Sequence, residues 1–206
     1  MGTVHENKQQ KQERLLETAF SLFTSKGMAK TSISDIASAA GVAKGTFYLY
    51  FRDKYDLGNK LIARKSRTLF DHALARLEQE RPSSVEDQMI LLIDDLLDQM
   101  EKNPMLLRFI NKNLSWGVFQ NALHQTDTAD NYDYLALFYE MLQMDDSVEW
   151  DEPLLMLYTI IELVGSTCHS IILEKNPTDL AHYKPILYRN VRSIIHNHQH
   201  PKKKTP

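Results

Sequence analysis

The sequence predicts an all-α protein: an N-terminal helix-turn-helix unit of three helices, followed by a larger helical body, about nine helices in all. Two observations predict this class. Glycine and proline number only seven each in 206 residues. Apolar residues recur at helical spacing, and no segment alternates apolar and polar residues as a half-buried strand does. With 43% hydrophobic residues, the chain can bury a sizeable core.

The first helix is predicted from about Lys8 to Ser25, and Gly27 ends it. Its apolar stripe consists of Leu15, Leu16, Ala19, Phe20 and Phe23. This helix should pack across the next two helices and brace them.

Residues 31–54 are the most informative segment of the chain. Ser32 precedes a short apolar-periodic run, and Asp35 follows three residues later, which is a capping pattern at the start of a helix. Gly41 stands where that helix should end, in a left-handed conformation that glycine adopts without steric cost. A second short helix is predicted from about Ala43 to Phe51.

That second helix has an unusual outward face. If Phe47 and Phe51 face the core, the outward residues are Lys44, Gly45, Thr46, Tyr48 and Tyr50. Hydroxyl and ammonium groups donate to phosphates, and a glycine lets the backbone approach a duplex closely. The pattern therefore favours DNA binding over its alternative, an ordinary helix-turn-helix corner in an all-α core.

The run GVAKGTFYLYF at 41–51, followed by Asp53, Lys54 and Leu57, resembles the signature of the TetR family of bacterial repressors. Tyr55 departs from the family pattern, where an acid is usual, and Asp53 stands where Ser or Asn is commoner. The resemblance is strong over about residues 10–60, and beyond them it rests on length and helical pattern. It implies a repressor that binds a pseudo-palindromic operator as a homodimer and is released by a small hydrophobic effector.

Lys54 breaks a local rule. With Asp53 as N-cap, it occupies the first position of the fourth helix, where the helix dipole disfavours a cation. A phosphate there would accept from the lysine and from helix N–H groups together; the alternative is a tolerated surface lysine. The complete set of predicted DNA contacts is Thr31, Ser32, Ser34, Lys44, Gly45, Thr46, Tyr48, Tyr50 and Lys54. Lys44 and Thr46 are the predicted base-reading residues, and the others should mainly contact phosphates.

The charge distribution supports a nucleic-acid partner for the N-terminal third. Residues 1–67 hold 12 Lys and Arg against 6 Asp and Glu, a net of +6. Residues 68–206 hold 12 against 21, a net of −9. This asymmetry is expected when one part of a protein meets polyphosphate and the other does not.

The remaining helices are predicted from apolar stripes and breaks. They are the fourth from Asp53 to about Glu80, a fifth capped by Ser83 and Glu86, a sixth from Asn103-Pro104, a seventh over Leu114 to about His124, an eighth near Asn131 to Met144, a ninth over 151–175, and a last one ending near His198. Pro185 either kinks the last helix or marks its start.

Three domains are expected: a DNA-binding domain over 8–52, an effector-binding and dimerisation domain over 53–198, and a flexible tail over 199–206. Residues 151–175 are apolar nearly all round, so they need partners on every side. The resemblance implies that the last two helices pair across a two-fold axis. The predicted interface residues are Ile160, Val164, Cys168, Leu187, Val191 and Ile194. The alternative is a monomer with an unusually apolar core.

An effector pocket is expected among the middle helices, on the strength of the resemblance. Its candidate lining residues are Met89, Met100, Phe109, Trp116, Phe119, Phe138, Tyr158, Glu162 and His169. Flexible Met and aromatic walls suit a broad hydrophobic ligand, and a buried Glu162 would favour a cationic or hydrogen-bond-donating one. Each of these residues also fits an ordinary core position.

The sequence gives little indication of a disulfide framework, a membrane segment, catalysis or metal binding. The one cysteine, Cys168, excludes an intrachain disulfide framework and fits a reducing cytoplasm. No signal peptide is expected, and no segment is expected to approach a membrane span. Asp94 and Asp98 suggest a solvated helix face rather than catalysis or metal binding, and His196, His198 and His200 suggest a frayed tail rather than a metal site.

We therefore expect no cofactor, no metal and no enzymatic activity. A DNA-binding regulator without an effector, or less plausibly a helical enzyme, remain the alternatives to a ligand-responsive repressor.

Overall fold

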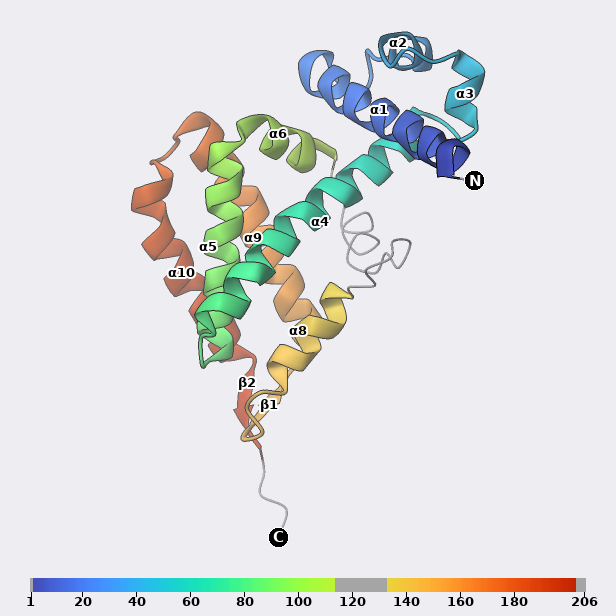
Figure 1. The fold of residues 1–206 in the computed structure, drawn as a ribbon. Coiled ribbons are helices and arrows are strands. Elements are labelled where there is room, and N and C mark those ends of the chain that lie inside the picture. Colours follow the sequence, from blue (N-terminus) through green and yellow to red (C-terminus); the bar gives the residue numbers. More distant parts are fainter. Residues whose placement is uncertain (1, 114–132, 203–206) are drawn as a thin grey trace. The chain divides into compact units, whose positions relative to one another are not determined.

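A computed structural model describes residues 2–113 and 133–202 of the chain (Figure 1). Its helices are α1 (Gly2–Lys26), α2 (Ile33–Ala39), α3 (Lys44–Tyr48), α4 (Lys54–Glu80), α5 (Val85–Lys102), α6 (Pro104–Asn113), α8 (Tyr134–Leu142), α9 (Pro153–Glu174) and α10 (Leu180–Asn197). Two short strands, β1 (Val148–Trp150) and β2 (Gln199–Pro201), complete the described elements. The all-α prediction is confirmed. The predicted seventh helix lies outside the described residues.

The chain divides into two compact units. Among the described residues, 2–66 and 108–113 form the first unit, and 67–107 with 133–202 form the second. Helix α4 contributes its first half to one unit and its second half to the other. The sequence predicts a boundary between residues 52 and 53 that separates a DNA-binding domain from an effector-binding one. That functional division stays a prediction.

The first unit is built on a stripe of α1. Leu15 and Ala19 are fully buried, together with Ile36 of α2, Phe47 of α3 and Leu57 of α4. Phe109, in the middle of α6, contacts Phe20 edge to face and stacks nearly parallel to Phe23. Burying one such side chain contributes about 1.5–3 kcal/mol, so these contacts hold three short segments in one arrangement.

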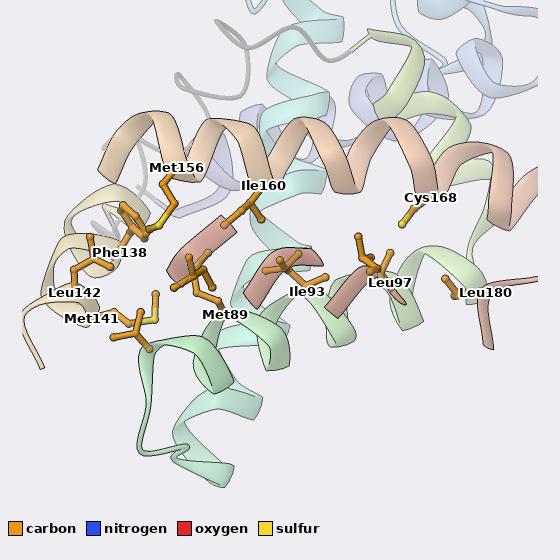
Figure 2. Close-up of a cluster of buried hydrophobic side chains, with 14 of the residues drawn as sticks. Met89, Ile93, Leu97, Phe138, Met141, Leu142, Met156, Ile160, Cys168 and Leu180 are labelled. Carbon is orange, nitrogen blue, oxygen red and sulfur yellow. The ribbon is translucent and has the colours of Figure 1, made fainter. Parts of the chain in front are cut away.

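The core of the second unit joins α5, α8, α9 and α10 (Figure 2). Met156, Ile160 and Cys168 of α9 point toward Met89, Ile93 and Leu97 of α5, while Phe138, Met141 and Leu142 enter from α8. Leu187, Val191 and Ile195 of α10 belong to the same cluster and are each 0% exposed.

The starts of helices α5 and α10 differ slightly from the predictions. Helix α5 is capped by Ser84, whose hydroxyl accepts from the N–H of Asp87 at 3.0 Å, and not by the predicted pair Ser83 and Glu86. Adjacent serines followed by adjacent acids give the same pattern in two registers. Helix α10 is capped by Asp179 and continues through Pro185, so Pro185 is not its start.

Strands β1 and β2 are an addition that the sequence did not predict. They pair antiparallel, with Glu149 opposite His200, and thereby join the loop after α8 to the end of α10. The indole N–H of Trp150 donates to the carbonyl of Leu142 at 2.9 Å. Residues 199–201 are therefore paired, although the sequence places the start of a flexible tail at residue 199.

Candidate nucleic-acid interface

The segment from α2 to α3 has the geometry that the sequence predicts. The hydroxyl of Ser32 accepts from the N–H of Asp35 at 3.0 Å, and the Asp35 carboxylate accepts from the N–H of Ser32 at 2.9 Å. Gly41 has a φ of +67°, and the next N–H, of Val42, donates to the carbonyl of Ala37 at 3.0 Å. The capping box and the glycine turn are confirmed.

Asp35 also ties α2 to the end of α1. Its carboxylate lies 2.9 Å from the ammonium of Lys26, the last residue of α1. The main-chain N–H of Ser32, the Lys26 ammonium and the Ser32 hydroxyl together lower the pKa of Asp35 from 3.8 to about 2. The carboxylate therefore stays charged at neutral pH.

Helix α3 turns its aromatic pair inward. Phe47 is 0% exposed and Phe51 2%, and their ring centroids lie 5.5 Å apart. The predicted outward residues Lys44, Gly45 and Tyr48 are exposed, while Thr46 and Tyr50 are half-buried. A Cβ added at Gly45 would meet nothing within 4 Å, so the backbone there is open to close approach.

The predicted contacts before α2 divide into two groups. Ser32 and Ser34 are exposed. Thr31 is 1% exposed, and its hydroxyl donates to the carbonyl of Gly27 at 2.9 Å. Its side chain therefore serves the connection between α1 and α2, which corrects the prediction of a phosphate contact. A sequence pattern does not tell whether a hydroxyl near a helix start faces solvent or a local carbonyl.

Lys54 has a structural role that the sequence did not reveal. Asp53 caps α4 as predicted, accepting from the N–H groups of Tyr55 at 2.7 Å and Asp56 at 2.8 Å. The Lys54 ammonium donates to the carbonyls of Met28 and Ala29 at 3.0 and 3.1 Å, and to that of Thr31 at 3.0 Å. The lysine at the first helical position thus ties α4 to the connection between α1 and α2.

Other basic residues of the first unit also lie against its own side chains. The Lys60 ammonium is 5.5 Å from the ring centroid of Phe51, and that of Lys65 is 4.9 Å from the centroid of Phe20. Arg64 forms an ion pair with Glu13. Lys30, Lys44 and Arg52 are exposed.

The predicted effector-lining residues are not brought to one place. Met89 and Phe138 lie in the core of the second unit, whereas Phe109 packs within the first unit. Trp116 and Phe119 lie outside the described residues. Tyr158 and Glu162 are exposed on α9, and Met100 and His169 are half-buried. Glu162 is therefore not a buried carboxylate, which removes the physical reason for expecting a cationic ligand.

The predicted dimer-interface residues are largely occupied by the chain's own core. Ile160, Cys168, Leu187 and Val191 are at most 2% exposed, and Val164 and Ile194 pack against the same cluster. Burial raises the pKa of the Cys168 thiol to about 11. Ile160, Cys168, Leu187 and Val191 are therefore core residues of the single chain, whereas Val164 and Ile194 are partly buried and stay predicted interface residues. An apolar stripe has the same spacing whether it faces its own core or a second copy.

Asp94 and Asp98 belong to a network of ion pairs. The Asp94 carboxylate accepts from Lys184 of α10 at 2.6 Å and from Arg76 of α4 at 3.1 Å, and Tyr188 donates to it as well. Burial would raise the pKa of Asp94, but these three donors together lower it. Within the described part of the chain, no group of three His, Cys, Asp or Glu residues could hold a metal ion.

Helix α9 has less cover than its composition requires. Among the described residues it alone is long and apolar enough to cross a membrane by length and composition, contrary to the expectation from sequence. In the single chain, 22% of its most apolar window is buried. Leu155, Thr159, Glu162 and Ser166 form an exposed stripe along it.

The capped helix α2, the glycine turn and the outward face of α3 define a helix-turn-helix module of the kind that enters a DNA groove. The family model for "Bacterial regulatory proteins, tetR family" matches residues 15–60. This range covers the C-terminal part of α1, the whole helix-turn-helix and the start of α4.

Curated relatives match over different lengths. The HTH-type transcriptional regulator YvdT of Bacillus subtilis is 36% identical over 89 residues, 43% of each chain. The nucleoid occlusion factor SlmA of Haemophilus ducreyi is 28% identical over 137 residues, 66% of each chain. The matched segment spans less than half the length of the first curated relatives, at 43, 16 and 25%.

Solved structures match along nearly the whole chain. A tetR family transcription regulator from Shewanella sp. PV-4 has a TM-score of 0.70 at 20% identity, covering 92% of this chain and 98% of its own. FadR of Bacillus subtilis, solved in complex with stearoyl-CoA, has a TM-score of 0.62 at 19% identity, covering 89% and 99%. At these identities the likeness shows the fold. The family model and the curated relatives together support a regulator of the tetR family, on the match over residues 15–60.

Proposed function

We propose that the protein is a ligand-responsive transcriptional repressor that binds duplex DNA through α2 and α3. The observation that carries the proposal is the outward face of α3, which presents an ammonium group, hydroxyls and an open glycine backbone on a rigidly anchored helix. A net charge of +6 over residues 1–67 supports a polyanionic partner. Curated relatives include BepR of Brucella suis, named a transcriptional repressor.

The residues proposed to contact DNA are the predicted ones whose side chains are exposed or half-buried in the structure. Lys44 and Thr46 are the proposed base-reading residues of α3. Ser32, Ser34, Tyr48 and Tyr50 are proposed to donate to phosphates, and Gly45 to allow close approach. Lys54 acts chiefly through its three carbonyl partners, and so positions α4 against the α1–α2 connection.

We propose that the protein binds a pseudo-palindromic operator as a homodimer, with one α3 in each half-site. The partner copy would cover the exposed stripe Leu155, Thr159, Glu162 and Ser166 of α9 and the adjoining face of α10. The support is the incomplete burial of α9, whose apolar window requires cover that the described chain does not supply.

The proposed effector is a small hydrophobic molecule that binds in the second unit. The support is indirect: the core there contains the methionines Met89, Met141 and Met156, whose flexible side chains repack easily around apolar ligands. FadR of Bacillus subtilis, a structural relative, is in complex with stearoyl-CoA. Acyl thioesters and fatty acids therefore belong in a first ligand screen. A cytoplasmic location follows from this function.

The test begins with selection of duplexes from a random pool by the purified protein, followed by fluorescence anisotropy with the selected duplex. We expect a pseudo-palindromic consensus and an affinity that falls with salt in proportion to the phosphates contacted, with a log–log slope of about −0.9 for each. Lys44→Ala should relax the consensus. Failure to enrich any duplex over the starting pool would contradict DNA recognition.

A second candidate is a DNA-binding protein that needs no effector. The match to a nucleoid occlusion factor extends over 66% of both chains and so reaches beyond the helix-turn-helix. The two candidates differ in one measurement. A repressor of the proposed kind is stabilised thermally by a small apolar compound that also weakens DNA binding, and the second candidate is not.

A further inference from the structure

The most exposed large apolar side chain in the described part of the chain belongs to the C-cap residue of the proposed DNA-reading helix α3. Leu49 is 74% exposed, whereas the next most exposed ones, Tyr55 and Met144, are each 58% exposed. A single exposed leucine is common at a protein surface, so the significance of Leu49 comes from its position on the proposed DNA-reading face and not from its exposure alone.

Leu49 lies directly opposite the buried anchor of α3. Its backbone is helical (φ −73°, ψ −18°), and the next turn closes through the N–H of Phe51 to the carbonyl of Phe47 at 3.0 Å. At 100° per residue, Leu49 and Gly45 point about 160–200° away from Phe47. These two residues form the outermost ridge of the helix, and the open backbone at Gly45 lets that ridge approach a surface closely.

We propose that Leu49 reads a thymine in each half-site of the operator, by packing its side chain on the C5-methyl group in the major groove. This inference rests on the proposed function, since it needs a duplex against α3. A leucine side chain neither donates nor accepts hydrogen bonds. The only apolar group that a base pair presents in the major groove is the thymine methyl. At helical spacing, Thr46 and Tyr48 lie on either side of this ridge, and both carry hydroxyls, so the apolar contact falls to Leu49.

The experiment removes the methyl from the DNA and the leucine from the protein. The wild-type protein first selects its duplex from a random pool. Each thymine of the consensus is then replaced by deoxyuridine, symmetrically in both half-sites, and affinities are measured for wild type and Leu49→Ala. One buried methyl corresponds to about a fourfold change in affinity for one half-site.

We expect one thymine at which deoxyuridine weakens wild-type binding by about fourfold or more. The same replacement should not affect Leu49→Ala, and Leu49→Met should restore the difference. Met105→Ala, a change at an apolar side chain that is 50% exposed in α6, should behave as wild type. Because Leu49 is so exposed, Leu49→Ala should fold normally.

Two results would overturn the inference while leaving the proposed function intact. One is a selected duplex at which no deoxyuridine replacement distinguishes wild type from Leu49→Ala. The other is an equal loss of affinity for Leu49→Ala on thymine and deoxyuridine duplexes. If wild type selects no duplex, the proposed function itself fails, and the inference fails with it.

Discussion

The ammonium of Lys54 donates hydrogen bonds to three main-chain carbonyls at the connection between α1 and α2. Without the lysine, these carbonyls would have to accept from water. Lys54→Met keeps much of the side-chain length and removes all three donors. A hydrogen bond to a charged group contributes about 1.5–3 kcal/mol, and the half-exposed position favours the lower end. We expect a melting temperature lower by about 3–6 °C, measured by circular dichroism.

Lys44→Met is the matched control, since Lys44 is an exposed lysine on the same unit. It should leave the melting temperature unchanged and alter DNA binding instead. A different pattern would return Lys54 to the phosphate role that its sequence position suggests. In that case Lys54→Met would leave the melting temperature unchanged and reduce the salt slope of DNA binding by about one.

Asp35 gives a prediction for pH dependence. Its pKa in the folded protein is about 2, below the ordinary value of 3.8, so the folded state favours the charged form. The stability that this carboxylate contributes is complete above about pH 4 and is lost as pH falls toward 2. Asp35→Asn should therefore be less stable than wild type at pH 7, and the difference should narrow between pH 4 and 2.

Urea unfolding of both proteins across this pH range checks the prediction. Asp146→Asn, at an exposed aspartate in the loop before β1, serves as the control and should track wild type. A stability difference between Asp35→Asn and wild type that stays constant down to pH 2 would show that the charge of the Asp35 carboxylate is not its cause.

At the scale of elements, the structure makes α9 the helix most in need of a partner. Leu155 is 55% exposed on it, at the head of the stripe that continues through Ser166. Leu155→Arg adds a charge on that stripe without entering the core. We expect sedimentation at micromolar concentration to show a dimer for wild type and a monomer for Leu155→Arg, with unchanged helix content.

Tyr139→Arg, on the exposed side of α8, is the control and should remain dimeric. Val191→Glu distinguishes interface from core. Val191 is 0% exposed in the single chain, so a charge there should unfold the second unit rather than yield a folded monomer. A wild-type monomer at these concentrations would refute the dimer, and a dimeric Leu155→Arg would place the interface elsewhere.

The extent of sequence prediction differs between elements for physical reasons. The segment from Ser32 to Phe51 was predicted closely because caps, a glycine turn and an i, i+4 aromatic pair act over a few residues. The pairing of β1 with β2 was missed because it joins two three-residue strands some fifty positions apart. Four predicted interface residues of α9 and α10 lie in the chain's own core, because periodicity gives the apolar face of a helix and not what covers it.

The roles of individual site residues are likewise only partly predictable from the sequence. The exposed face of α3 follows from the sequence once Phe47 is placed inward. The hydrogen bonds of Thr31 and Lys54 do not follow from it, because their acceptors are main-chain carbonyls of a connection whose path no side-chain pattern encodes. The sequence alone does not single out Leu49, since an aliphatic residue beside two aromatic ones also fits a core position. Its exposure in the structure is what identifies it.

At the scale of the whole molecule, helix α4 is the element shared by the basic unit and the acidic one. In the second unit its residue Arg76 reaches Asp94 of α5, and Lys184 of α10 reaches the same carboxylate. A ligand that repacks the core between α5, α9 and α10 would therefore shift groups that hold the second half of α4. We propose that such a shift reaches the first unit along α4, because both units share this helix.

We accordingly expect the effector to release DNA. Ligand and operator would select different states of one equilibrium, and a coupling of about 1–3 kcal/mol gives a change of about 5- to 150-fold in each affinity.

The measurement is a thermal-shift screen of lipophilic cations, neutral hydrophobes and fatty acids, followed by titration of each stabilising compound into the DNA complex. Reciprocity requires that DNA weaken ligand binding by the same factor. Because Glu162 is exposed, Glu162→Gln should leave the ranking of ligands unchanged. Compounds that stabilise the protein yet leave DNA affinity unaltered would show that ligand binding and DNA binding are independent.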